Sequence, residues 1–288
     1  MNYRHSFHAG NSADVVKHCL LIALVRALQL KESALTLIDT HAGCGLYDLE
    51  GEDATRTGES TQGVLRAFAD TNPLLDDYRA AVRAVNEGEA VDDGAAVNDG
   101  VGPRLYPGSP KFLAQLLRPQ DHLILNEKHP EDIHALRSAM RGTSAAVHER
   151  DAYEFWLAML PPRTPRGVVV VDPPYEQTDE RERITATLAA AQRKWAHGVT
   201  VIWYPLKDRA THVRWKAQLR RLGIPKLLSV EHWLYDSDQP GIYNGAGLFI
   251  VNPPYAFTQA LPPLLEALRA ALAPEGHRGE ITADWLGD

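Results

Sequence analysis

Short apolar runs alternate along the chain with longer stretches in which apolar residues recur at helical spacing. The runs are rich in β-branched residues and bounded by turn residues, which is typical of buried strands. We expect seven strands, at residues 35–39, 121–126, 145–148, 167–171, 199–203, 226–234 and 247–251. Helical patterns cover residues 14–30, 51–84, 111–117, 130–141, 152–160, 180–196 and 211–222. This alternation predicts an α/β fold: a mostly parallel sheet with helices on both faces.

Two stretches depart from the alternation. No helix separates the strands at 226–234 and 247–251, so they form a hairpin and one of them must run antiparallel to the rest. Residues 87–103 are acidic, glycine-rich and nearly devoid of large apolar side chains. We interpret this second stretch as a mobile loop.

Composition narrows the classes of function. The chain has 288 residues, enough for one large domain or one domain with an insertion, and 44% of them are hydrophobic. A net charge of −7 and a pI of about 5.9 argue against a sequence-blind binder of polyanions, which is normally basic. A nucleic-acid substrate remains open if basic residues cluster locally.

Cysteine content and hydropathy bear on the compartment. Cys19 and Cys44 have neither metal-ligand spacing nor a disulfide framework, which fits a reducing compartment. The longest apolar stretch, residues 19–30, is interrupted by Arg26 and Gln29 and is too short to cross a membrane. The first eight residues do not resemble a signal peptide. We therefore expect a cytoplasmic protein with no membrane segment and no metal site.

The tetrapeptide Asp172-Pro173-Pro174-Tyr175 is the most informative candidate site, because it directly follows the apolar run 167–171. The Asp172 carboxylate and the Pro173 carbonyl can accept hydrogen bonds from an exocyclic amine. The prolines hold the backbone so that these acceptors keep their direction. The Tyr175 ring offers a stacking face for a flat heterocycle. The alternative is an ordinary proline-stiffened loop.

Three more polar signals follow predicted strands. The first strand ends in Asp39 and enters the small-residue turn 40–45, which lacks the third glycine of a dinucleotide site and suits a SAM (S-adenosylmethionine) site better. Glu127 follows the second strand, where a carboxylate can bind both hydroxyls of a ribose. Asp151 and Ala152 follow the third strand, where a carboxylate or a backbone amide can meet an adenine edge.

Each of these signals also has a structural alternative. The turn can simply join a strand to a helix, Glu127 can cap the helix after Pro130, and Asp151 can cap the helix that begins at Ala152. However, the carboxyl ends of parallel strands meet at one edge of an open sheet. We therefore expect these three sites and the Asp172 tetrapeptide to converge on one crevice.

The amino terminus interleaves aromatic and basic side chains, as a nucleic-acid surface requires. These residues are Tyr3, Arg4, His5, Phe7 and His8, followed on the first predicted helix by Lys17 and His18. The alternatives are a solvated Lys17 and a core histidine at His18.

A second tetrapeptide, Asn252-Pro253-Pro254-Tyr255, imitates the first. It follows the hairpin strand at 247–251. If that strand is the antiparallel one, its carboxyl end lies at the opposite edge of the sheet from the crevice. We therefore assign the chemistry to Asp172 and not to Asn252.

Together these motifs resemble the RlmJ family, the bacterial 23S ribosomal RNA adenine-N(6) methyltransferases. The resemblance runs nearly end to end, and the amino-terminal block is its most specific part. It is carried by the segments Tyr3–Asn11, Asp14–His18, Asp39–Gly43, Tyr106–Pro110, Glu127 with His129-Pro130, Asp172–Tyr175 and Trp203–Pro205.

The resemblance implies a Rossmann-like fold that binds SAM, with a small helical subdomain inserted after the first strand. Residues 1–50 and 104–288 would form the methyltransferase domain, and residues 51–103 the insertion with its flexible acidic loop, which is longer than the family needs. Ala152 replaces the glycine usual in the family, a change that a backbone contact tolerates. By position, the family's cofactor contacts fall on His18, His41, Ser109, Glu127, Asp151, Ala152 and Asp172.

The implied activity is methyl transfer from SAM to the exocyclic amine of an adenine in 23S ribosomal RNA, catalysed by a monomer. Asp172 and the Pro173 carbonyl would bind the amine, and Tyr175 would stack on the flipped base. A further catalytic role falls to Lys17, and the RNA or the amino terminus would be held by Tyr3, His5 and Lys17. The alternatives are a DNA adenine methyltransferase and a non-catalytic RNA-binding or assembly protein with a methyltransferase fold.

Overall fold

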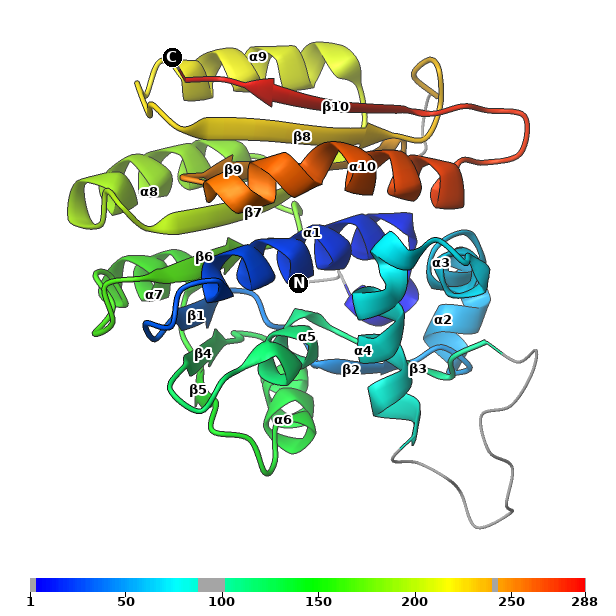
Figure 1. The fold of residues 1–288 in the computed structure, drawn as a ribbon, viewed down its shortest axis with the longest axis horizontal. Coiled ribbons are helices and arrows are strands. Elements are labelled where there is room, and N and C mark those ends of the chain that lie inside the picture. Colours follow the sequence, from blue (N-terminus) through cyan, green and yellow to red (C-terminus); the bar gives the residue numbers. More distant parts are fainter. Residues whose placement is uncertain (1–3, 88–101, 240–242, 288) are drawn as a thin grey trace.

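The computed structural model describes residues 4–87, 102–239 and 243–287, so Tyr3 and most of the predicted acidic loop lie outside the described residues. One large sheet forms the centre of the molecule (Figure 1), with strand order β10-β8-β9-β7-β6-β1-β4-β5. Its strands are β1 (Thr36–Asp39), β4 (His122–Asn126), β5 (Ala146–His148), β6 (Gly167–Val171), β7 (Val199–Leu206), β8 (Leu227–Trp233), β9 (Gly245–Val251) and β10 (Glu280–Trp285). All seven predicted strands are present.

Strand direction follows the prediction. β1 pairs in parallel with β4 and β6, and β6 pairs in parallel with β7. β9 lies between β7 and β8 and is antiparallel to both. It is therefore the reversed strand of the hairpin, and its carboxyl end lies at the opposite edge of the sheet from those of β1, β4 and β6.

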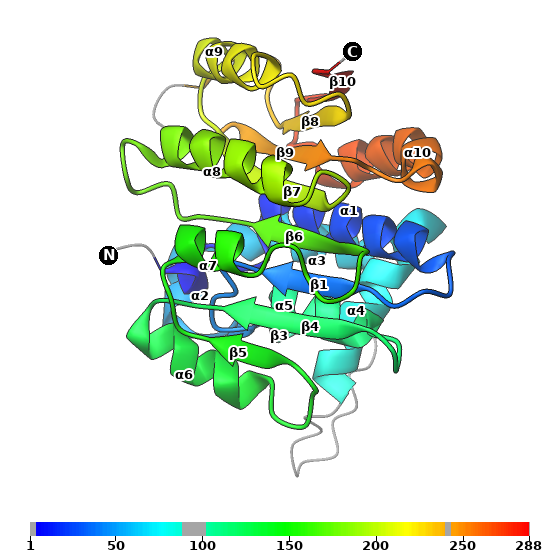
Figure 2. The same cartoon turned by 90° about the vertical axis from the view of Figure 1, so that its left-hand side faces the viewer.

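Helices cover both faces of the sheet (Figure 2), as the alternating pattern predicts. Val168 and Val170 of β6 belong to the apolar cluster that contains α1 (Ser12–Gln29), α5 (Ser109–Leu116) and α10 (Tyr255–Leu272). Val169 and Val171 belong to the cluster on the other face, with α7 (Ala152–Ala158), α8 (Glu180–Lys194) and α9 (Arg209–Arg220). Because successive strand residues point to opposite faces, a continuous valine run serves a strand that is buried on both sides.

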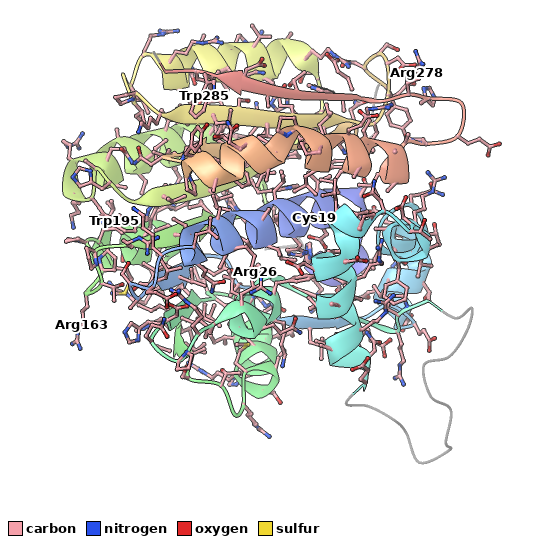
Figure 3. All side chains as sticks on the ribbon, viewed as in Figure 1. Cys19, Arg26, Arg163, Trp195, Arg278 and Trp285 are labelled. Atoms are coloured by element: carbon pink, nitrogen blue, oxygen red, sulfur yellow. The ribbon has the colours of Figure 1, made fainter. Side chains whose placement is uncertain are left out.

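α1 is buried along most of its length because it lies between the sheet and further helices. It contacts α10, α5, α4 (Asp76–Asn86) and β9. Cys19 is buried on this helix, whereas the Arg26 side chain is largely exposed (Figure 3). α6 (Pro130–Ala139) follows β4 and contributes Ile133 and Leu136 to the same core.

The segment after β1 is largely helical, as predicted. It contains β2 (Leu46–Asp48), α2 (Glu52–Thr57), η2 (Glu59–Gln62), α3 (Val64–Ala69), η3 (Pro73–Leu75) and α4 (Asp76–Asn86), and β3 (Leu105–Pro107) pairs with β2. Val64, Tyr78 and Val82 join the apolar cluster around α1. Treating residues 51–103 as a separate inserted subdomain stays a prediction.

The sequence prediction lacks the short strands β2 and β3, the strand β10 and the helix α10. β10 adds an eighth, antiparallel strand beside β8, and it is largely exposed. An exposed edge strand needs no apolar run, so it carries no strand signal. α10 contains Pro262 and Pro263, residues that normally interrupt a helix. In the described part of the chain, no helix is both long enough and apolar enough to span a bilayer.

Candidate active site

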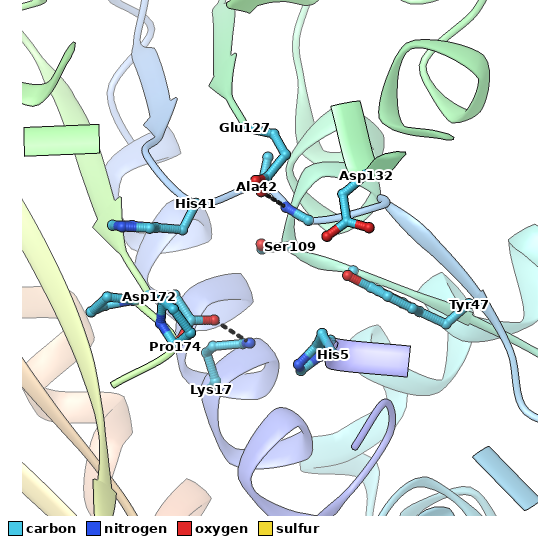
Figure 4. A pocket seen from close by; sticks show the side chains of 13 residues that line it. His5, Lys17, His41, Ala42, Tyr47, Ser109, Glu127, Asp132, Asp172 and Pro174 are labelled. Carbon is cyan, nitrogen blue, oxygen red and sulfur yellow. Dashed lines mark hydrogen bonds and ion pairs between the residues drawn. The ribbon is translucent and has the colours of Figure 1, made fainter. Parts of the chain in front are cut away.

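A pocket opens at the carboxyl edge of the parallel strands (Figure 4), where the sequence predicts a crevice. The ends of β1, β4 and β6 all contribute to it. It is lined by His5, Lys17, His41, Ala42, Gly43, Tyr47, Gly108, Ser109, Glu127, Asp132, Asp172, Pro173 and Pro174. A second pocket shares His41, Glu127 and Pro174 with the first and extends to Asp151 and Ala152. Four strand-end signals that are far apart in sequence therefore meet at one place.

An ion pair lies in this pocket between Asp172 and Lys17. Lys17 Nζ is 2.7 Å from Asp172 Oδ2 and 2.8 Å from Asp14 Oδ1. The Lys17 side chain is only 5% exposed, so the alternative of a merely solvated lysine is wrong. Burial acts to lower the pKa of Lys17, but the carboxylates of Asp14 and Asp172 outweigh this effect and raise it. Lys17 therefore stays positively charged beside the catalytic candidate.

The amino-terminal segment lies against the same pocket. His5 Nε2 is 2.9 Å from Asp14 Oδ2, and the His5 ring makes an edge contact with Tyr47. Several polar contacts tie this segment to α2 and η2, including His8 with Glu59 and Ser6 with Asp53. His5 lines the pocket, and its predicted role in holding the RNA or the amino terminus stays a prediction.

Tyr175 adopts a strained conformation after the two prolines. Its φ is 53°, in the left-handed region that a non-glycine residue rarely occupies. Its hydroxyl donates to the carbonyl of Trp203 at 2.7 Å, and its ring makes edge contacts with Trp203 and Trp215. These contacts anchor the tetrapeptide to β7. Tyr175 is not among the residues that line either pocket, so its stacking role stays a prediction.

Glu127 joins β4 to the turn after β1. Its Oε2 accepts the Gly43 N–H at 2.8 Å, and its Oε1 accepts the His129 N–H at 2.7 Å. Burial raises the pKa of this carboxyl, although these backbone hydrogen bonds oppose the shift. Gly43 has a φ of 60°, and a Cβ there would lie 2.3 Å from the Tyr47 hydroxyl, so the turn requires glycine. The contact with His129, just before α6, agrees with part of the capping alternative.

Asp151 is the N-cap of α7, as its structural alternative predicts. Its Oδ1 accepts the Tyr153 N–H at 3.1 Å, while its Oδ2 pairs with Lys128 at 3.2 Å and Arg183 at 3.5 Å. Both Asp151 and Ala152 line the second pocket. A capping role and a pocket position therefore coexist at Asp151.

The second tetrapeptide, residues 252–255, has a structural role. Asn252 also has a positive φ, 52°, but it follows the antiparallel β9. Its Nδ2 donates to the carbonyls of Ala196 and Gly198, just before β7 begins. Asn252 thus lies at the opposite edge of the sheet from Asp172, as predicted, and the assignment of the chemistry to Asp172 stays a prediction.

Comparisons with known proteins identify the family. The family model described as "Ribosomal RNA large subunit methyltransferase D, RlmJ" matches residues 32–287. The chain belongs to the RlmJ family. It is 36% identical to Ribosomal RNA large subunit methyltransferase J of Escherichia coli (strain K12) and 35% identical to the protein of that name from Haemophilus influenzae. Each match covers 99% of both chains.

A crystal structure is similar to this chain over nearly its whole length. The protein LPL1258 of Legionella pneumophila aligns with a TM-score of 0.83 at 30% identity, over 96% of this chain and 98% of that one. Family membership makes the chain a methyltransferase enzyme with a Rossmann-like fold, and SAM is its methyl donor.

The residues present fit the SAM molecule that the RlmJ family implies. Two buried polar atoms, Asp39 Oδ2 and His18 Nε2, have no hydrogen-bond partner within the described part of the chain, although neither residue lines a pocket described above. His18 is fully buried against Tyr106 and Phe112 and does not line either pocket, so its cofactor role stays a prediction. The lining residues His41, Ser109 and Glu127 combine acceptors and donors suited to an amino acid and a ribose, and roles for them stay predictions too.

Burial shifts the pKa values of His41 and Asp39 in the direction that favours the neutral form of each side chain. Burial lowers the pKa of His41 to about 4, so its ring is uncharged at neutral pH. Burial raises the pKa of Asp39 to about 7, although hydrogen bonds from Ser109 and the His41 backbone oppose this. Among the described residues, no group of three or more His, Cys, Asp or Glu side chains is arranged to hold a metal ion.

The raised pKa of Asp39 predicts how the stability of the protein changes with pH. Its folded-state pKa lies above its ordinary value of 3.8, so its contribution to stability is present below pH 4 and is lost as pH rises through 7. The free energy of unfolding of Asp39→Asn, relative to that of wild type, should therefore increase as the pH rises from 4 to 8. We expect a few kcal/mol, at about 1.4 kcal/mol per pKa unit. Urea unfolding at several pH values measures this difference, and a pH-independent difference would contradict it.

Asp121→Asn is a control for which the expected change in stability at neutral pH has the opposite sign. Asp121 is also buried, but hydrogen bonds from Arg118 and backbone N–H groups outweigh desolvation and lower its pKa. Its contribution is present above its unfolded pKa and is lost as pH falls. The Asp121 variant should therefore be less stable than wild type at neutral pH.

Proposed function

We propose that this chain transfers a methyl group from SAM to the N6 amine of one adenine in 23S ribosomal RNA. The observation that carries the proposal is the Asp172–Lys17 pair in the pocket of an RlmJ-family chain. The curated relatives are named as methyltransferases of large-subunit ribosomal RNA. The two cysteines are free, which supports a role in the cytoplasm, and we propose a monomer.

The pocket residues suit the reaction because the amine is a poor nucleophile. Its lone pair is delocalised into the adenine ring, so acceptors for both amine hydrogens would localise it. Lys17 contacts one Asp172 oxygen, and the carboxylate has further lone pairs to accept the amine. The Pro173 carbonyl is the second acceptor that we propose. SAM supplies an electrophilic methyl group on a sulfonium centre.

Orientation supplies much of the rate in such a transfer, because the amine must approach the methyl group in line. The strained Tyr175 and the two prolines fix the acceptors in place. We further propose that Tyr175 stacks on the target base after it leaves its helix. Tyr3 and His5, from the amino-terminal segment, would contact the RNA.

The Glu127 carboxylate should contribute to SAM affinity. We propose that it accepts hydrogen bonds from the ribose hydroxyls, so Glu127→Ala should weaken SAM binding by roughly 1–3 kcal/mol. Isothermal calorimetry with SAM, with S-adenosylhomocysteine and with NAD measures this. Glu149→Ala is a suitable control, because that carboxylate is exposed and pairs with Arg137 away from the pocket lining. Tight NAD binding, or unchanged SAM affinity in the Glu127 variant, would count against the proposal.

Substrate discrimination tests the proposed function. The net charge of −7 provides no global attraction for nucleic acid, so recognition must be local and depend on RNA shape. A small folded 23S fragment that carries the target adenine should be methylated. Duplex DNA should be a poor substrate, because extracting a paired base costs a few kcal/mol. Equal methylation of both would favour the DNA alternative, and methylation of neither would favour a non-catalytic protein.

A further inference from the structure

Asp14 connects the amino-terminal segment to the catalytic candidate Asp172. Its side chain is only 2% exposed. Asp14 Oδ2 accepts the Gly10 N–H at 2.9 Å and lies 2.9 Å from His5 Nε2. Asp14 Oδ1 lies 2.8 Å from Lys17 Nζ, which also reaches Asp172 Oδ2 at 2.7 Å. A continuous series of polar contacts thus runs from residues 5–10 to the pocket.

Helix capping accounts for only part of the contacts of this buried carboxylate, because the Gly10 N–H at the start of α1 is one partner while His5 and Lys17 are others. The N-cap of α1 is Asn11, whose side-chain oxygen accepts the Asp14 N–H at 3.0 Å. A buried carboxylate is costly unless it is paired. Burial acts to raise the pKa of Asp14, but the neighbouring His5 and Lys17 outweigh it, so the pKa falls well below its usual range. Asp14 is therefore a charged partner of Lys17.

Lysine needs such a second partner in order to hold a fixed position. Its ammonium is a point charge on a flexible four-carbon stem, unlike the planar fork of arginine. One contact with Asp172 would restrain the position of the ammonium less than two contacts do. Contacts with both Asp14 and Asp172 define where the ammonium lies, and the backbone of α1 places Asp14 and Lys17 one turn apart.

We propose that Asp14 is a positioning residue: it fixes Lys17, which in turn orients Asp172, and it makes this orientation depend on an ordered amino-terminal segment. The inference rests on the proposed function. The contacts of Asp14 with His5 and Gly10 form only when residues 5–10 lie against α1. RNA that binds this segment would therefore stabilise the productive orientation of Asp172.

A double-mutant cycle tests whether Asp14 acts through Lys17. Single-turnover methyl transfer is measured at saturating SAM and RNA for wild type, Asp14→Asn, Lys17→Met and the double variant. We expect Asp14→Asn to slow transfer by about 5- to 10-fold while the SAM dissociation constant changes less than about twofold. The double variant should be within about threefold of Lys17→Met. The proposal is overturned if the rate effects of the two single substitutions multiply in the double variant, or if Asp14→Asn keeps the wild-type rate.

Two controls separate positioning from loss of structure. Asp121→Asn removes a buried carboxylate that pairs with Arg118 and accepts the Leu35 N–H outside the pocket lining. It should lower stability without slowing the folded enzyme. If Asp14→Asn does not fold, Asp14→Glu takes its place in the cycle, because it keeps the charge but moves the carboxylate. Wild-type methylation in the same assay checks the proposed function separately: if wild type is inactive, that function fails.

Discussion

Asp172→Ala should reduce methyl transfer by at least ~100-fold while the protein stays folded. On the proposed mechanism, the variant loses the acceptor that orients the amine and that can take its proton. The fold should survive because Lys17 keeps its contact with Asp14, so no buried cation is left unpaired. Transfer from labelled SAM to 23S ribosomal RNA measures the rate, and circular dichroism and thermal unfolding check the fold.

Asn252→Ala is the matched control for Asp172→Ala, since it changes the equivalent position of the imitating tetrapeptide. Asn252 donates to the carbonyls of Ala196 and Gly198 at the far edge of the sheet. Its replacement should cost some stability but leave the rate of the folded enzyme within a few-fold. Near-normal turnover in Asp172→Ala, or a large loss in Asn252→Ala, would show that the chemistry is assigned to the wrong tetrapeptide.

Lys17→Met should lower both activity and stability. The substitution leaves the buried carboxylate of Asp14 without its cation and frees Asp172 to rotate. Breaking a buried ion pair by removing one partner typically costs about 3–5 kcal/mol of unfolding free energy. We expect transfer by the folded variant to fall at least ~10-fold, because Asp172 is no longer held. Urea unfolding and single-turnover kinetics measure the two effects.

Lys216→Met is a control that separates the loss of stability from the loss of activity. Lys216 Nζ is 2.9 Å from the buried Glu231, in a second ion pair that lies outside both pocket linings. This control should be destabilised in the same way, yet its folded molecules should transfer methyl groups at the wild-type rate. If Lys17→Met keeps that rate too, the Lys17–Asp172 contact is structural only.

The fold was largely predictable because its central strands are buried on both faces. Continuous β-branched runs such as 167–171 can hardly form anything else when breakers flank them. The sequence did not predict β10 because exposed edge strands keep polar residues. It did not predict α10 because Pro262 and Pro263 interrupt the helical pattern of its apolar residues. In both cases tertiary packing, not local pattern, decides the structure.

The site was predictable where it depends on topology and less so where it depends on packing. Asp172 and Glu127 follow parallel strands, so the sheet itself brings them together. The ion pair that joins Lys17 to Asp172 spans 155 residues and leaves no trace in local periodicity. Asp14 received no site role from the sequence, although its spacing of three residues from Lys17 on a helix is a usable signal.

The most direct test of the central claim is nucleoside analysis of unmodified 23S ribosomal RNA after incubation with the purified chain and methyl-labelled SAM. Genomic DNA serves as a parallel substrate. We expect the label in N(6)-methyladenosine at a single RNA position, at most one per molecule, with none in DNA and with labelling at least ~100-fold slower when Asp172→Ala replaces wild type. Label in another nucleoside, label in DNA at an equal rate, or full labelling by the Asp172 variant would contradict the account.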